Sequence, residues 1–144
     1  MNVYETPKKQ EFHLEGVKHI SVKSAFELIS DDKIFFIDVR EKAEHRIEYF
    51  DFNNVFLYPL STILDNIQLI PNGVPLVIVC NEGIRSAKVA NLLNRQGFSN
   101  VSNLDGGIHE WRNQGLPITE GIKIADISGN CNSGGCSCGC DGCG

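Results

Sequence analysis

The stretch of the chain best suited to chemistry runs from Cys80 to Ser86 and reads Cys-Asn-Glu-Gly-Ile-Arg-Ser. Residues 76–80 are continuously apolar, which predicts a buried central strand of a parallel sheet, and Ser86 stands near the start of a predicted helix. Cys80 would then lie at the carboxyl end of the sheet, where open α/β folds place their sites. Loop amides and the positive end of the helix would bind an anion and favour a thiolate. We expect Cys80 to act as a nucleophile rather than to fill the core.

The residues after Cys80 suit the binding of an anionic substrate. Gly83 permits a tight turn, and Arg85 supplies a fixed cation for a tetrahedral anion. The combination of Cys, Gly, Arg and Ser at this spacing, followed directly by a helix, favours function more strongly than the cysteine alone. We take Cys80 as the catalytic candidate and the next six residues as substrate-binding candidates: Asn81, Glu82, Gly83, Ile84, Arg85 and Ser86.

The elements that would position this loop alternate between strand and helix patterns. Apolar runs predict strands at 18–22, 34–39, 54–57, 76–80 and 101–104. Helical patterns lie between them at 24–30, from about 41, and at 61–70, 86–96 and 108–113, with Gly97 placed for a left-handed C-cap. This alternation predicts one α/β domain over residues 16–117. Residues 1–15 are a polar lead-in arm without a clear period.

Composition disfavours two classes of partner. The 144 residues carry 13 Lys plus Arg against 18 Asp plus Glu, a formal net charge of -5, so there is no basic excess for binding nucleic acid. No apolar run in the sequence approaches the roughly 20 residues that cross a bilayer. The lysines near the N-terminus are not followed by the apolar segment of an export signal. We expect a cytoplasmic protein that binds neither nucleic acid nor membrane.

Three motifs resemble those of the single-domain rhodanese-like sulfurtransferases, over about residues 17–117. The active-site loop of that family is similar to Cys80-x4-Arg85-Ser86, and its strand end to Ile37-Asp38-Val39-Arg40-Glu41. Its C-terminal signature is similar to Val101-x2-Leu104-Asp105-Gly106-Gly107-Ile108-x-Glu110-Trp111. The resemblance implies an α/β fold with a doubly wound, five-stranded parallel sheet and helices on both faces.

The resemblance also implies a reaction. Cys80 would take sulfane sulfur from thiosulfate or a persulfide donor, become a persulfide, and pass the sulfur to cyanide or to a thiol, such as that of a thioredoxin-like protein, without a cofactor. The four residues between Cys80 and Arg85 favour this reaction, since related phosphatases and arsenate reductases use one more. Glu82 would repel the thiosulfate dianion, which favours a neutral or protein-borne persulfide. The alternative is a weakly catalytic or non-catalytic rhodanese-like module whose Cys-rich tail binds a soft metal or senses redox state.

Outside the loop from Cys80 to Ser86, we expect several residues to have structural rather than catalytic roles. Residues 47–54 depart from the family's Gly-His-Ile and Pro-Gly-Ala signature, which leaves substrate specificity open. We expect Asp38 and Arg40 to point to opposite sides of their strand and to serve structural hydrogen bonding, and Trp111 to fill the core. The four histidines lack metal-ligand spacing and are read as surface or satisfied residues: His13, His19, His45 and His109.

Five of the six cysteines crowd into the end of the chain: Cys131, Cys136, Cys138, Cys140 and Cys143. We expect residues 118–128 to be a linker and residues 129–144 a Cys/Gly-rich tail that is disordered alone. The Cys-x-Cys spacing in a Gly/Ser background favours binding of soft ions such as Cu(I) or Zn(II). A tethered sulfur acceptor, a redox-sensing segment and an inert extension are the alternatives that the sequence leaves open.

Overall fold

The computed structural model describes residues 3–121, and the chain divides into two compact units. The first unit comprises the chain up to Lys42 together with Phe50–Pro117. The second comprises Ala43–Tyr49 with the stretch from Ile118 on. The five tail cysteines predicted to bind metal, Cys131 to Cys143, lie outside the described residues.

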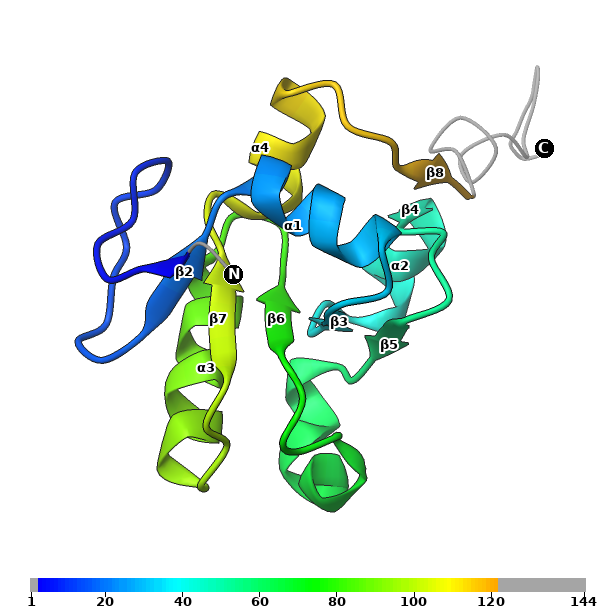
Figure 1. Cartoon of the computed structure of the whole chain (residues 1–144). Helices are drawn as coiled ribbons and strands as arrows, with labels where there is room; N and C mark the ends of the chain where they lie inside the picture. The colour runs from blue at the N-terminus through cyan, green and yellow to red at the C-terminus, as the bar shows by residue number, and fades with distance from the viewer. Residues whose placement is uncertain (1–2, 122–144) are drawn as a thin grey trace, which may run out of the picture. The chain divides into compact units, whose positions relative to one another are not determined.

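The first unit is built on a six-stranded sheet with the order β1-β2-β7-β6-β3-β5 (Figure 1). Its strands are β1 (Val3–Tyr4), β2 (Lys18–Ile20), β3 (Phe35–Asp38), β5 (Val55–Leu57), β6 (Leu76–Val79) and β7 (Val101–Leu104). Every pairing from β2 to β5 is parallel, which confirms the five parallel strands. β1 adds an antiparallel sixth strand that the sequence did not predict, because two residues are too few to show an alternating pattern.

Four helical segments belong to this unit: α1 (Val22–Ser30), η1 (Leu60–Leu69), α3 (Ile84–Arg95) and α4 (Gly107–Asn113). The segment predicted as a helix at 61–70 is a 3₁₀ helix, η1. α3 begins at Ile84, two residues before the predicted start, because Gly83 adopts a left-handed conformation (φ 89°) and serves as its N-cap. Gly97 has a φ of 96°, as predicted for the end of this helix.

The helices cover both faces of the sheet. On one face, Ile37 of β3 and Ile78 of β6 lie in one apolar cluster with Leu93 of α3. On the other face, the Phe36 and Trp111 rings meet edge to face, with centroids 5.8 Å apart, and Trp111 is fully buried, as predicted. The side chains of Phe36 and Ile37, which are neighbours on β3, therefore pack against helices on opposite faces of the sheet.

Two further features of the core lie between β4 and β5 and at the end of β3. Phe50, which lies within the departure from the family pattern, is buried with its ring centroid 4.8 Å from that of Trp111. Asp38 and Arg40 form a buried ion pair, with 2.9 Å between Asp38 Oδ2 and Arg40 Nη2. The expectation that these two side chains point to opposite sides is wrong, since residues two apart on an extended strand share a face.

The second unit contains most of α2 (Lys42–Ile47), together with β4 (Glu48–Tyr49) and β8 (Thr119–Glu120). β4 and β8 pair antiparallel, and the Gly121 amide donates to the Ile47 carbonyl at 2.8 Å. This short ribbon ties the chain after Pro117 to the segment that follows α2.

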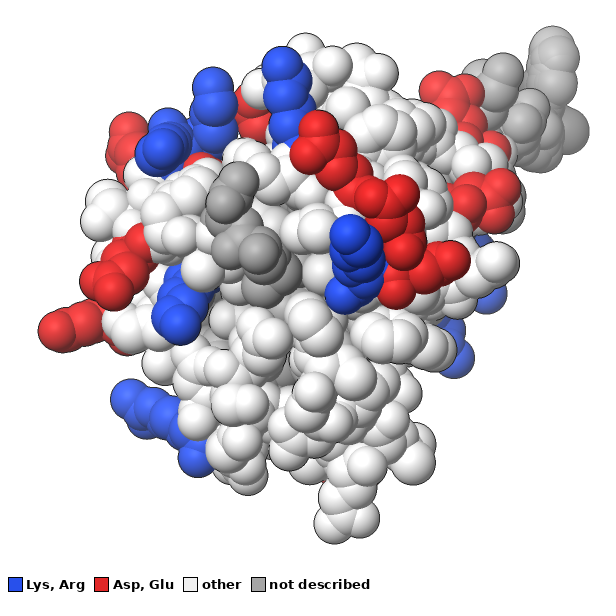
Figure 2. Space-filling model, in the orientation of Figure 1, with Lys and Arg blue, Asp and Glu red and all other residues white. Residues whose placement is uncertain are grey.

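The visible face of the molecule carries charges of both signs in its upper part and mainly uncharged side chains in its lower part, over η1 (Figure 2). Leu64 and Leu69 of η1 are 65% and 69% exposed. Within residues 3–121, none of the helices is both long enough and apolar enough to span a bilayer.

Candidate active site

Cys80 follows directly after β6, which lies between β3 and β7 in the sheet. Its side chain is buried, and its sulfur is surrounded by hydrogen-bonding groups of the loop. The amides of Gly83 and Ser86 donate to Sγ at 3.0 and 3.3 Å, and the Ser86 hydroxyl lies 3.2 Å from it. Two fixed N–H donors aimed at one sulfur are the arrangement that stabilises negative charge on a thiolate or a persulfide.

The local sequence explains why these two amides converge. Gly83 adopts a φ of 89°, which glycine tolerates and which turns the chain into α3. Ser86 lies in the first turn of α3, where backbone N–H groups have no acceptor within the helix, so its amide is free to donate to the sulfur. The helix therefore aims its positive end at Cys80.

The start of α4 holds the loop from the other side. The amides of Ile108 and His109 donate to the carbonyls of Cys80 and Asn81, at 3.0 and 2.9 Å. Gly107, with a φ of 63°, lets the two backbones approach so closely that a Cβ at this position would lie 2.5 Å from the Cys80 carbonyl oxygen. Gly107, the first residue of α4, thus belongs to the architecture of the Cys80 loop.

The remaining loop residues divide between the interior and the surface. Asn81 and Arg85 are half-buried, whereas Glu82 and Ile84 are exposed. A pocket of about 550 Å³ opens beside the loop. Its lining includes Glu82 and Ile84 from the loop, and Gly106 and His109 from the start of α4; the N-terminal arm contributes Lys9, Gln10, Glu11 and Phe12.

The N-terminal arm is fastened to the first unit through Asp105, which is fully buried at the end of β7. Its carboxylate accepts hydrogen bonds from the Tyr4 hydroxyl at 2.6 Å and from the amides of Lys8 and Lys9 at 2.8 and 3.1 Å. Burial, and then the hydrogen bond to Asp105, raise the pKa of Tyr4 well above its ordinary value. These contacts lay residues 9–12 along the pocket beside the Cys80 loop.

The Gln10 side chain extends from the N-terminal arm and lies between the Cys80 loop and the start of α4. Its carboxamide donates to the Gly83 carbonyl at 3.1 Å and accepts from the Gly106 amide at 2.8 Å. It also contacts Asn103 at 3.1 Å, and Asn103 contacts the Ser86 hydroxyl. Sequence reasoning selected neither Gln10 nor Asn103 as a site residue, although both connect to the group beside the Cys80 sulfur.

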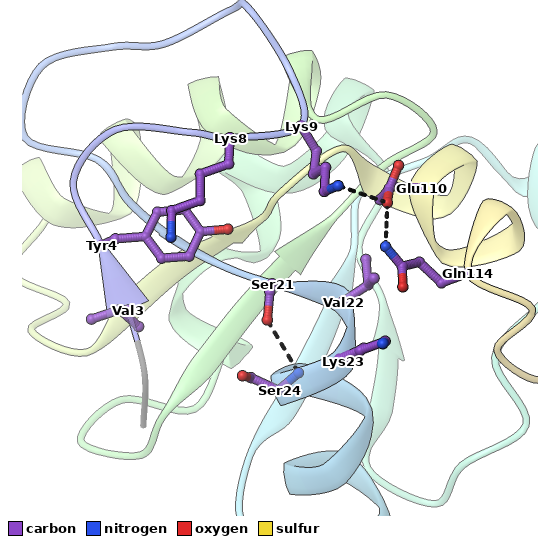
Figure 3. A pocket seen from close by; sticks show the side chains of 10 residues that line it. All are labelled: Val3, Tyr4, Lys8, Lys9, Ser21, Val22, Lys23, Ser24, Glu110 and Gln114. Atoms are coloured by element: carbon purple, nitrogen blue, oxygen red, sulfur yellow. Dashed lines mark hydrogen bonds and ion pairs between the residues drawn. The ribbon is translucent and has the colours of Figure 1, made fainter.

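A second pocket, of about 440 Å³, lies between the arm and the start of α1 (Figure 3). The Lys8 ammonium sits over the Tyr4 ring, 4.7 Å from its centroid. On the opposite side, Lys9 and Gln114 both reach Glu110. Residues 80–86 contribute nothing to the lining of this pocket, which separates it from the candidate site.

The described residues give no support for a metal centre. Among residues 3–121, His, Cys, Asp and Glu side chains do not gather in a group of three that could hold an ion. His13 and His19 do meet, with 3.0 Å between His13 Nδ1 and His19 Nε2. What the described part of the chain does present is one cysteine sulfur, that of Cys80, with two backbone amides donating to it.

Comparison with known proteins places these features in a family. The family description of the rhodanese-like domain matches residues 21–114. A sulfurtransferase from Allochromatium vinosum is 32% identical over 103 residues, which cover 71% of this chain and 94% of that protein. The crystal structure of a rhodanese-like domain protein from Staphylococcus aureus superposes with a TM-score of 0.61 at 32% identity, covering 71% of this chain and 98% of that chain.

A larger protein also shares this domain. A tRNA uridine(34) hydroxylase from Erwinia tasmaniensis is 29% identical over 101 residues. The match covers 63% of this chain but only 28% of that protein, so the likeness extends over about a quarter of the larger relative. The motif around Cys80, the parallel sheet and these matches agree: the chain belongs to the rhodanese-like domain family and is related to its sulfurtransferases.

Proposed function

We propose that the protein is a sulfurtransferase that carries sulfane sulfur as a persulfide on Cys80. The observation that supports this most directly is the convergence of the Gly83 and Ser86 amides on the Cys80 sulfur. These donors suit an anionic sulfur better than a neutral one, because each amide N–H directs the partially positive end of its dipole at the sulfur. The relationship to the Allochromatium vinosum sulfurtransferase supports the same reaction class.

In the first step the Cys80 thiolate attacks the outer sulfur of the donor. With thiosulfate, a new S–S bond forms on Cys80 as the S–S bond of thiosulfate breaks, and sulfite leaves with the bonding electron pair. With a persulfide donor, the leaving group is the donor's own thiolate. The product in both cases is a Cys80 persulfide, whose terminal sulfur carries the negative charge.

In the second step an acceptor attacks the terminal sulfur of the Cys80 persulfide. A thiolate acceptor leaves as a persulfide and cyanide leaves as thiocyanate, and in both cases Cys80 regains its thiolate. The two half-reactions use the same sulfur in turn, so donor and acceptor should show ping-pong kinetics. No redox cofactor is needed because the sulfur moves between thiolates without net loss of electrons.

The pocket beside Cys80 favours a donor other than free thiosulfate. The carboxylates of Glu82 and Glu11 both line it, against one ammonium group, that of Lys9, so the net negative charge of the lining opposes the approach of a dianion. Phe12 and Ile84 add apolar surface to the same lining. We propose a persulfide on a small thiol or on a protein as the donor, and a thiol such as that of a thioredoxin-like protein as the acceptor.

Intact-protein mass spectrometry after incubation with a persulfide donor or with thiosulfate tests the proposal. Wild type should gain one sulfur mass, and peptide mapping should place it on Cys80. Cys80→Ser should lose the adduct in a chain truncated after Ser128, which removes the competing tail cysteines. Full sulfur transfer by Cys80→Ser, or Cys80-dependent hydrolysis of an aryl phosphate, would contradict the proposal.

A further inference from the structure

The orientation of the Gln10 carboxamide is fixed by the backbone around it. A backbone amide can only donate and a carbonyl can only accept. The Gly106 amide lies 2.8 Å from one end of the carboxamide, which must therefore be the oxygen, Oε1. The carbonyls of Phe12 and Gly83 lie 2.8 and 3.1 Å from the other end, which must be the nitrogen, Nε2. Three backbone groups thus agree on one orientation.

This orientation determines the direction of the next two hydrogen bonds. Gln10 Oε1 can only accept, so the Asn103 atom 3.1 Å away is its amide nitrogen. The other end of Asn103 is then its oxygen, Oδ1, which contacts the Ser86 hydroxyl. Because Oδ1 can only accept, Ser86 donates its single hydroxyl proton to Asn103.

The consequence reaches the Cys80 sulfur. With its proton directed to Asn103, the Ser86 oxygen presents a lone pair to Sγ at 3.2 Å. A Cys80 thiol can donate its proton to the Ser86 oxygen. A Cys80 thiolate would instead be repelled by the lone pair of that oxygen. We propose that Gln10 is a positioning residue for Cys80, acting through Asn103 to keep the Ser86 hydroxyl from donating to the sulfur. This inference rests on the proposed role of Cys80 as the nucleophile.

The same chain of hydrogen bonds also determines which ring nitrogen of His19 carries a proton. Asn103 Nδ2 lies 3.0 Å from His19 Nδ1, so this ring nitrogen must accept and carry no proton. The proton of neutral His19 then sits on Nε2 and is donated to His13 Nδ1, 3.0 Å away. His19 and Asn103 are both fully buried, so water does not compete for these contacts. A neutral His19 also agrees with its lowered pKa, which burial causes.

Gln10→Met is the variant that removes the hydrogen bonds of the Gln10 carboxamide while keeping the size of the side chain. Methionine keeps roughly the length and bulk of glutamine but offers neither the acceptor for Asn103 nor the donor for Gly83. Asn103 can then turn over, provided that His19 adopts its other tautomer, and the Ser86 hydroxyl becomes free to donate to the sulfur. Gln68→Met, at an exposed position of η1, is the matched control, and the unfolding midpoint of each variant checks the fold.

The first measurement is the tautomer of His19 by ¹⁵N NMR of histidine-labelled protein, with the His19 signals assigned from His19→Gln. Wild type and Gln68→Met should show His19 protonated on Nε2 alone. Gln10→Met should show a mixture of the two tautomers. A proton on Nδ1 in the wild type, or an unchanged tautomer in Gln10→Met, would overturn the proposal.

The second measurement is the rate of Cys80 alkylation at one pH, in chains truncated after Ser128. Gln10→Met should react about threefold to fivefold faster than wild type, the size expected for one net hydrogen bond to the thiolate. The ratio between iodoacetamide and a bulky iodoacetamide should stay constant. A rise that grows with reagent size would show that Gln10 only covers the site. Neither readout needs a sulfur donor, so failure to form a persulfide would refute the proposed function without deciding this inference.

Discussion

Gly107 stands against the backbone of Cys80: a Cβ at position 107 would lie 2.5 Å from the Cys80 carbonyl oxygen and 2.6 Å from that of Asn81. The first amides of α4 donate to these same two carbonyls. The loop that holds the candidate nucleophile is therefore shaped by a second loop, more than 20 residues further along the chain. Only a residue without a side chain allows this approach.

Gly107→Ala should accordingly lower both stability and the rate of Cys80 persulfide formation. The left-handed φ of 63° alone disfavours alanine by about 1 kcal/mol, and the contact with fixed carbonyls must add to this by moving the loop. A displaced loop should slow persulfide formation by about tenfold or more. Gly115→Ala is the matched control, because Gly115 has a φ of 72° but open space around it. Equal rates in the two variants would contradict the role of the close approach.

The buried ion pair of Asp38 and Arg40 predicts an asymmetric response to substitution. Arg40→Met should lower the free energy of unfolding by about 3–5 kcal/mol, because it leaves the buried Asp38 carboxylate without this cation. The double variant Arg40→Met/Asp38→Asn should recover part of that loss, since both charges are then gone. Urea unfolding of the two single variants and the double variant measures the coupling. A double variant that loses the sum of the single losses would show that the pair is not coupled.

The sequence predicted the parallel sheet and the position of Cys80 because both depend on local pattern. The apolar run before Cys80 marks a central strand, and the spacing of Gly83 and Ser86 marks the turn into α3. The sulfur's hydrogen-bond partners could also be anticipated, because they come from the same seven residues. Local signals were sufficient wherever the relevant atoms are close in the chain.

The sequence did not predict the arm's part in the site, because the arm's contacts are distant in the chain. Gln10 lies in a polar segment without a period, and it meets Asn103, 93 residues away, only in the folded chain. One signal was available: β7 reads Val-Ser-Asn-Leu and is buried throughout, so its polar residues need internal partners. Asp38 and Arg40 were misplaced by a mistaken reading of strand geometry rather than by missing information.

Truncation after Ser128 should separate persulfide formation on Cys80 from metal binding by the tail cysteines. Among residues 3–121, the groups that contact the Cys80 sulfur lie within the first unit, so the truncated chain should still form the Cys80 persulfide. Bound Cu(I) or Zn(II), measured by elemental analysis after dialysis, should be lost with the five tail cysteines. A truncated chain that forms the Cys80 persulfide normally but no longer delivers sulfur to a thiol would show instead that the tail cysteines pass the sulfur from Cys80 to the acceptor.

His19 should make the stability of the fold decrease in mildly acidic solution. Burial lowers the pKa of His19 below its ordinary value of about 6.5, so the unfolded chain binds a proton at this residue more readily than the folded chain does. Its contribution to stability is therefore complete above about pH 6.5 and is lost as the pH falls from there toward the folded-state pKa. Denaturant unfolding at pH 7 and pH 5 should show a smaller loss in His19→Gln than in wild type. Replacement of the exposed His109 by Gln is the control, and an equal loss in wild type and His19→Gln would contradict the neutral, buried state of His19.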